Sequence, residues 1–243
     1  MAQGLIAEWK ADHLRVSLFS NKPWDVAPEA IFAGVFANAP EATSQKLSAG
    51  EATASGNWSS GRVEIKRTIN RIDCILQPPL PTQPELPLLS AIDALLPQFA
   101  SVLAEWATNQ SQDVVRIALG CNGLMSVTDV NEGYRKLHDM VRVINVDAER
   151  FRDMQFQVNL PAQSKSDQEL LLNRLTTWSA IQVQAGIFSP GAVQAVENRH
   201  YCVCSIDINT DGDRTTPLFK SGIGVLIAEM CQEAIVILDQ GIE

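Results

Sequence analysis

The sequence contains few of the residues from which catalytic and metal sites are usually built. Its 243 residues include only three histidines and five cysteines. The cysteines are odd in number and form no CxxC pair, so neither a disulfide framework nor a zinc ribbon is indicated, and reduced, mostly buried thiols are expected. No GxSxG, SxxK, HExxH, GxGxxG or GxxxxGK[ST] motif occurs. The most recognisable signatures of hydrolases, zinc proteases and nucleotide-binding proteins are therefore missing.

Positive charge is also in short supply. The chain has 19 Lys and Arg against 28 Asp and Glu, which gives a net charge of −9 and makes nucleic acid an unlikely partner. Residues 1–12 show no secretory signal. The most apolar stretch, residues 222–238, is interrupted by Glu229 and Glu233 and falls short of the ~18 uncharged residues that a membrane helix needs. We therefore expect a soluble cytoplasmic protein that does not enter a membrane.

What the sequence does have is apolar material and a single strong boundary. Hydrophobic residues make up 46% of the chain, which is enough for a large core. Proline fixes φ and lacks an amide donor, so residues 78–87 are expected to run extended as a connector. They would join a strand-rich lobe, residues 1–77, to an α+β lobe, residues 88–243, unless the two share one domain. Five of the twelve prolines lie there: Pro78, Pro79, Pro81, Pro84 and Pro87.

Short alternating strands are expected in the first lobe. Apolar residues alternate before and after Ala11-Asp12, which predicts a hairpin turning there. Residues 28–39 are expected to form a short helix, and residues 44–58 one or two edge strands. Across residues 62–76 the apolar phase slips near Asn70-Arg71, which predicts a bulge or a tight turn.

Helices and strands alternate more clearly in the second lobe. A helix is expected at residues 88–108, split or kinked at Leu96 because Pro97 follows. The helix at residues 129–144 has a capping box, with Thr128 or Asp129 as N-cap and Glu132 three residues after Asp129. Further strands at 114–119, 154–160, 175–185 and 200–208 precede a long apolar helix at 217–240. The order predicts an α+β protein with a mainly antiparallel sheet and helices packed on one face.

One motif suggests an enzyme. Glu64 and Lys66 flank an isoleucine on a strand, which places a carboxylate and an ammonium group on one face. With a helix at residue 28, strands in residues 44–69, a helix at 88 and a strand at 114, this resembles the core of the PD-(D/E)xK nuclease superfamily. The resemblance implies a metal-dependent phosphodiesterase holding Mg²⁺. The acid before the motif would be Glu51, where the family has an aspartate.

A second motif suggests a cation. Asp207, Asn209 and Asp211, followed by Gly212, match the first half of a calcium loop, and Asp213 adds a further carboxylate. The second half does not match, because the twelfth position, which needs a glutamate, is Leu218. Asp, Asn and Gly in this order are equally typical of an ordinary turn. The expectation is no cofactor, with Ca²⁺ or Mg²⁺ as the alternative.

The final helix carries the leading functional hypothesis. Its apolar residues spread around most of its circumference, which is more than one sheet face can cover. A surplus of this kind predicts either burial under neighbouring helices or an interface with a second copy or another protein. We therefore expect a non-catalytic binding or assembly subunit, with the nuclease as the alternative. The residues expected at the interface are Ile223, Leu226, Ile227, Met230 and Ile237.

Overall fold

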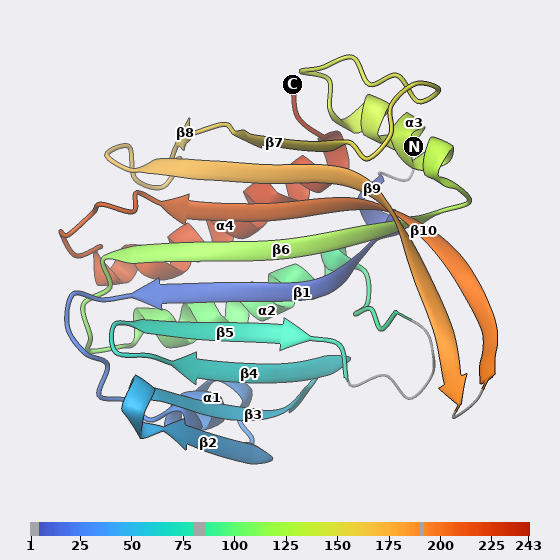
Figure 1. The fold of residues 1–243 in the computed structure, drawn as a ribbon. Coiled ribbons are helices and arrows are strands. Elements are labelled where there is room, and N and C mark those ends of the chain that lie inside the picture. Colours follow the sequence, from blue (N-terminus) through green and yellow to red (C-terminus); the bar gives the residue numbers. More distant parts are fainter. Residues whose placement is uncertain (1–4, 80–85, 190–191) are drawn as a thin grey trace.

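The fold class predicted from the sequence is confirmed. A computed structural model describes residues 5–79, 86–189 and 192–243. It contains a ten-stranded sheet, antiparallel at every pairing, and four α-helices (Figure 1). The strands are β1 (Trp9–Phe19), β2 (Ala42–Lys46), β3 (Glu51–Trp58), β4 (Gly61–Arg67), β5 (Arg71–Gln77), β6 (Arg116–Val127), β7 (Gln155–Asn159), β8 (Ala162–Gln163), β9 (Leu171–Ser189) and β10 (Ala192–Thr210). The helices are α1 (Pro28–Phe36), α2 (Ile92–Thr108), α3 (Val130–Met140) and α4 (Lys220–Gln240).

The two predicted lobes share one sheet. The strand order is β2-β3-β4-β5-β1-β6-β10-β9-β7, and β8 also pairs with β9. Because β1 pairs with β6, the first and second halves of the chain meet at the centre of the sheet, and one cluster of buried residues runs through both. The connector predicted at 78–87 leads from β5 toward α2, and its residues 80–85 lie outside the described part.

The two halves also repeat one topology. Each begins with a central strand, β1 or β6, which is followed by a helix. A meander then returns to pair its last strand, β5 or β10, with that central strand, and a second helix, α2 or α4, completes the half. Two such units joined through β1 and β6 make one wide sheet (Figure 1). No repeat is visible in the amino-acid sequence, since the two halves fill equivalent positions with different residues.

The predicted hairpin at Ala11-Asp12 is wrong. Residues 9–19 form one strand, and the pairing with β6 shifts register between Ala11 and His13. The extra residue, Asp12, makes a bulge. The bulge keeps Trp9 and Ala11 on the same buried face as Leu14. The alternation of buried and exposed residues therefore shifts by one position at Asp12 while the strand continues in the same direction. The slip near Asn70-Arg71 is a tight turn, as predicted, because β4 and β5 form a hairpin there.

Helix α2 is not split by its proline. The helix begins at Ile92, so Pro97 lies in its second turn rather than in its middle. The carbonyl that loses a hydrogen-bond partner belongs to Asp93, which is exposed, so water can bind it at little cost. Helix α3 is capped as predicted. Its N-cap Asp129 accepts a hydrogen bond from the Glu132 amide at 2.8 Å.

Helix α4 packs as a core helix, and this corrects the interface prediction. It lies against α2 and against β6 and β10 on the helix-covered face (Figure 1). All five residues predicted at an interface are at most 5% exposed within their own chain: Ile223, Leu226, Ile227, Met230 and Ile237. The surplus apolar surface is therefore covered mainly by α2. By length and composition alone this helix could cross a membrane, which differs from the sequence-based expectation, and half of its most apolar stretch is buried in the fold.

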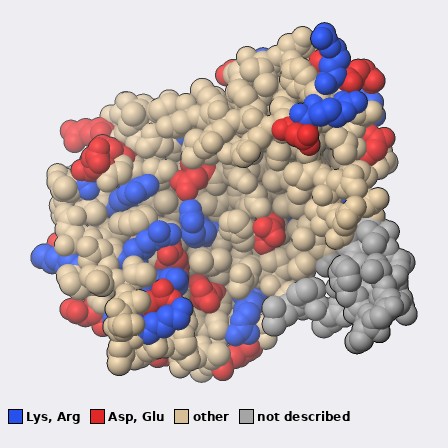
Figure 2. All heavy atoms as spheres, viewed as in Figure 1, with Lys and Arg blue, Asp and Glu red and all other residues tan. Residues whose placement is uncertain are grey.

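The opposite face of the sheet is not covered by the helices (Figure 1). Figure 2 shows this face, with Lys and Arg interspersed with Asp and Glu and no extended area of either sign. Antiparallel sheets commonly leave one face to water in this way. The described residues on this face therefore do not form the continuous cationic surface that binds a phosphate backbone.

Candidate functional site

A groove runs along the part of α4 that the core does not cover. Four residues at helical spacing make an exposed stripe on the helix: Ser221, Val225, Ala228 and Gln232. The opposite wall is the loop of residues 164–170 between β8 and β9. At the amino-terminal end of the helix the groove has a volume of about 580 Å³. A second hollow of about 390 Å³ continues along the helix beside Val225 and Gln232.

The groove exposes large apolar side chains to solvent. Phe219, just before the helix, is 81% exposed, and Val225 is 55% exposed. Leu170, Leu218 and Leu226 lie at most 7% exposed beneath them and join the groove to the core. Exposure of a phenylalanine ring to water is unfavourable in free energy. Exposed apolar surface of this kind, set in a concave site, is typical of a place where another molecule docks.

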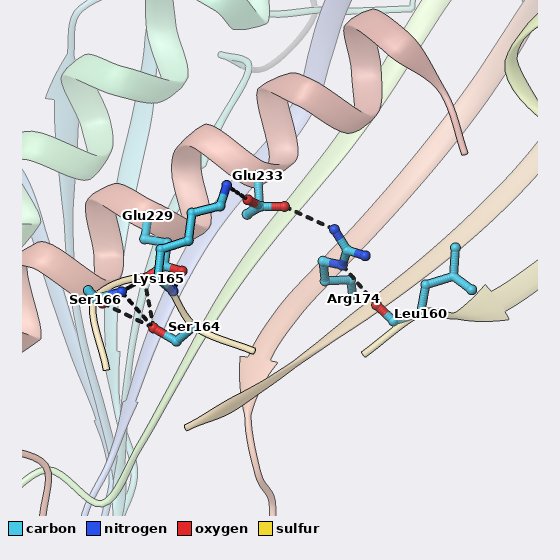
Figure 3. Close-up of polar contacts among 7 residues, drawn as sticks. All are labelled: Leu160, Ser164, Lys165, Ser166, Arg174, Glu229 and Glu233. Carbon is cyan, nitrogen blue, oxygen red and sulfur yellow. Dashed lines mark hydrogen bonds and ion pairs between the residues drawn. The ribbon is translucent and has the colours of Figure 1, made fainter. Parts of the chain in front are cut away.

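The loop wall is tied to α4 by the Glu229 carboxylate. This carboxylate accepts hydrogen bonds from the Ser164 and Ser166 hydroxyls at 2.8 and 2.6 Å (Figure 3). It also accepts hydrogen bonds from the amides of Lys165 and Ser166 at 2.6 and 3.1 Å. Four donors on three consecutive residues converge on one side chain, so the loop has a defined position against the helix.

One turn further along α4, Glu233 forms ion pairs with two basic side chains. Its carboxylate is 2.6 Å from Lys165 Nζ and 3.0 Å from Arg174 Nη1 on β9 (Figure 3). Arg174 Nε in turn donates to the Leu160 carbonyl at 2.8 Å. Helix, loop and sheet edge are therefore joined by a single chain of charge-assisted hydrogen bonds. We call this set of contacts, made by Glu229 and Glu233, the latch.

Both latch carboxylates stay ionised. Burial by itself raises the pKa of Glu229, but the hydrogen bonds from Ser166, Lys165 and Ser164 outweigh it and leave the pKa below its usual value. The pKa of Glu233 is lowered in the same way, because the bonds from Lys165 and Arg174 outweigh burial. Both carboxylates of the latch are therefore charged at neutral pH.

The residues of the nuclease resemblance form an ion-paired strand surface. The structure brings Glu51, Glu64 and Lys66 to one face of β3 and β4. Lys66 Nζ is 2.8 Å from Glu51, and Lys46 also binds this carboxylate. The hydrogen bond from Lys66 lowers the pKa of Glu51. The core of the PD-(D/E)xK superfamily has three strands between its two helices, whereas four strands, β2–β5, lie between α1 and α2 here, so the structure departs from that layout in its strand count.

The half-matched calcium loop does not gather its ligands. Asp207 and Asn209 are on β10, where Asp207 accepts a hydrogen bond from Arg15 at 3.0 Å and from the Asn209 side-chain amide (Nδ2) at 2.6 Å. Asp211 and Asp213 lie in the turn beyond the strand, and Asp211 accepts from the Asp213 amide. The carboxylates are therefore engaged by protein donors in two separate places. Within residues 5–79, 86–189 and 192–243, no three His, Cys, Asp or Glu side chains are grouped closely enough to hold a metal ion.

Arg15 is part of a polar network at the centre of the open sheet face. It pairs with Asp207 across Gly120 of β6, where a Cβ atom would lie 3.4 Å from the guanidinium. The glycine thus leaves the arginine room to reach from β1 to β10. At the end of β1, Arg71 of β5 and Arg116 of β6 stack on the ring of Phe19, at 5.1 and 4.9 Å from its centroid. These contacts order the face and link strands of both halves.

Most residues of the groove were not found from the sequence; Leu226, at its floor, is an exception. Phe219 and the loop wall carry no motif, and the stripe on α4 has one large apolar residue, Val225, among Ser221, Ala228 and Gln232, so it gives little hydrophobic signal. A helical wheel would have separated this stripe from the buried residues, but only the packing of α2 decides which side stays open. Comparison of the chain with protein-family models, with curated proteins and with solved structures gives no match in any of the three. The geometry of the groove is therefore the basis on which a function can be proposed.

Proposed function

We propose that this protein is a non-catalytic binding or assembly subunit that holds an apolar segment of another protein in the groove beside α4. The observation that carries the proposal is the exposure of Phe219 and Val225 at the mouth of a groove whose wall is fixed by the latch. A fixed wall supports binding, because a site that is already ordered does not lose conformational entropy when it is occupied.

A cytoplasmic setting is part of the same proposal. Five cysteines, all buried and none in a disulfide, suit a compartment where thiols stay reduced: Cys74, Cys121, Cys202, Cys204 and Cys231.

The size of the apolar surface sets what the partner must supply. Complete burial of a phenylalanine and a valine stabilises a complex by about 3–5 kcal/mol. Association costs of about 4–15 kcal/mol oppose it. Phe219 and Val225 are therefore too few to hold a partner unaided, and the rest of the groove, including its polar rim, must contribute.

Quantitative affinity purification from the source cells tests the proposal. Three baits are compared: the natural sequence, a Phe219→Ser/Val225→Ser variant, and a Leu47→Ser control. Leu47 is 88% exposed and lies in the short 3-10 helix Leu47–Ala49 between β2 and β3, which does not line the groove, so it controls for the removal of surface apolar area. We expect one stoichiometric partner that the natural and control baits retain and the groove variant loses. Equal retention by all three, or no partner on the natural bait, would overturn the proposal.

A further inference from the structure

The amino-terminal hollow of the groove carries negative charge only. Asp167 and Glu169 line it together with the apolar residues, and among the described residues no Lys, Arg or His does. Lys165 lines the second hollow, beside Glu229 and Glu233. Among the ion pairs of the described residues, neither Asp167 nor Glu169 takes part. Asp167 accepts a hydrogen bond from the Glu169 backbone amide at 3.0 Å, beside the apolar surface.

The cations closest in sequence are already engaged. Lys220 follows Phe219, but its Nζ donates to the Ser111 carbonyl at 2.8 Å, away from the groove. Lys165 Nζ is bound to Glu233 in the latch. The charge on the rim is therefore not balanced by the chain's own neighbouring lysines.

We infer that the occupant of the groove is a cationic segment of a different protein, with an apolar side chain for Phe219 and Val225 and a Lys or Arg beside it for Asp167 and Glu169. This rests on the proposed function and names the chemistry of its partner. A second copy of the chain is the poorer match, because each copy carries a net charge of −9 and would meet the acidic rim with like charge. Opposite charges at a rim raise the association rate and give specificity.

Two matched peptides test this inference on the full chain. The cationic probe is acetyl-GKLFKLKG-amide, and the neutral probe is acetyl-GQLFQLQG-amide, which has the same apolar residues. Dissociation constants are measured by NMR titration at low salt and again at about 1 M salt, where the Debye length is only ~3 Å. We expect the cationic probe to bind about tenfold more tightly at low salt. That advantage should disappear at high salt and in an Asp167→Asn/Glu169→Gln variant.

The controls separate this inference from the proposed function. An Asp139→Asn/Glu105→Gln variant removes two exposed carboxylates from α2 and α3 and should leave the advantage intact. If both probes bind equally and Phe219→Ser abolishes the binding of both, the proposed binding function of the groove is supported and the charge preference is overturned. If the rim variant keeps the full tenfold advantage, the charge preference is likewise overturned. If neither probe binds, or Phe219→Ser has no effect on binding, the proposed function fails as well.

Discussion

Substitution of glycine by alanine is predicted to have opposite effects on stability at two positions of α4. A Cβ atom added at Gly224 would lie 2.7 Å from Thr108 Oγ1 and 3.2 Å from the Ala104 carbonyl of α2. Thr108 cannot swing aside freely, because its hydroxyl donates to that same carbonyl at 2.8 Å. A Cβ atom at Gly222 would meet nothing within 4 Å. The pair therefore tests whether α4 and α2 pack as closely as the fold requires.

The magnitudes follow from these distances. Overpacking at Gly224 costs about 2–3 kcal/mol, and the gain in helix propensity returns about 1 kcal/mol, so Gly224→Ala should lower the free energy of unfolding by about 1–2 kcal/mol. Gly222→Ala should raise it by about 0.5–1 kcal/mol. For a chain of this length the two melting temperatures should differ by about 3–12 °C.

Urea denaturation and thermal melts of the purified variants provide the measurement. Thr108→Ala in the Gly224→Ala background removes the shortest contact, so the two substitutions should couple by about 1 kcal/mol in a double-mutant cycle. Equal stabilisation by both glycine substitutions, with no coupling to Thr108, would refute the packing of α4 against α2 and the argument that this packing leaves the opposite stripe open.

Three further predictions concern the latch, the α3 cap and the thiols. Glu229→Gln should destabilise the fold by about 1–2 kcal/mol at neutral pH, because a charged acceptor of four hydrogen bonds is lost. Since the folded pKa of Glu229 is lowered, its contribution is complete above the usual value of 4.5 and fades as the pH falls below it, so urea melts of the two proteins should converge in acid. Asp129→Ala should cost about 1 kcal/mol and increase amide exchange in the first turn of α3, because the N-cap is lost. Burial raises the pKa of Cys121 and of Cys202 to about 12, so these thiols should react with a disulfide reagent only after unfolding; rapid reaction of the native protein would contradict their burial.

The class of fold could be predicted from the sequence because it depends on local pattern. Alternation over residues 154–160 and the turn near Asn70-Arg71 gave strands in the right places, and Asp129 with Glu132 gave a helix start. Each of these signals is contained in fewer than ten residues. Short-range chemistry of this kind needs no knowledge of what packs where.

Features that depend on distant partners were missed. The register shift after Ala11 looks like a hairpin turn until β6 is seen to pair on both sides of it. The joining of the two lobes depends on the same β1–β6 pairing, between residues more than ninety positions apart. The repeated topology of the halves also leaves no trace in residue identity, because a sheet requires only alternation and not particular side chains.

The candidate site was half predicted. The surplus apolar circumference of α4 pointed to the correct helix, but the interface was placed on residues such as Leu226 and Met230, which α2 and the sheet bury. A high apolar content shows that most of a helix surface must be buried, but it does not show which side is buried by the rest of the same chain. Phe219 and Val225 became recognisable only once the buried side was known. At the motifs around Glu64 and Asp207, basic side chains contact the carboxylates: Lys66 pairs with Glu51, and Arg15 pairs with Asp207.

Site-specific photo-crosslinking in the source cells tests the central claim most directly. A photoreactive phenylalanine analogue replaces Phe219 in one strain and Leu47 in another, and the crosslinked products are compared by mass spectrometry after irradiation. The account predicts a single major heterologous adduct from position 219, with the attachment point beside a Lys or Arg of the partner, and no such adduct from position 47. Adducts of equal yield at both positions, or none at position 219, would contradict it.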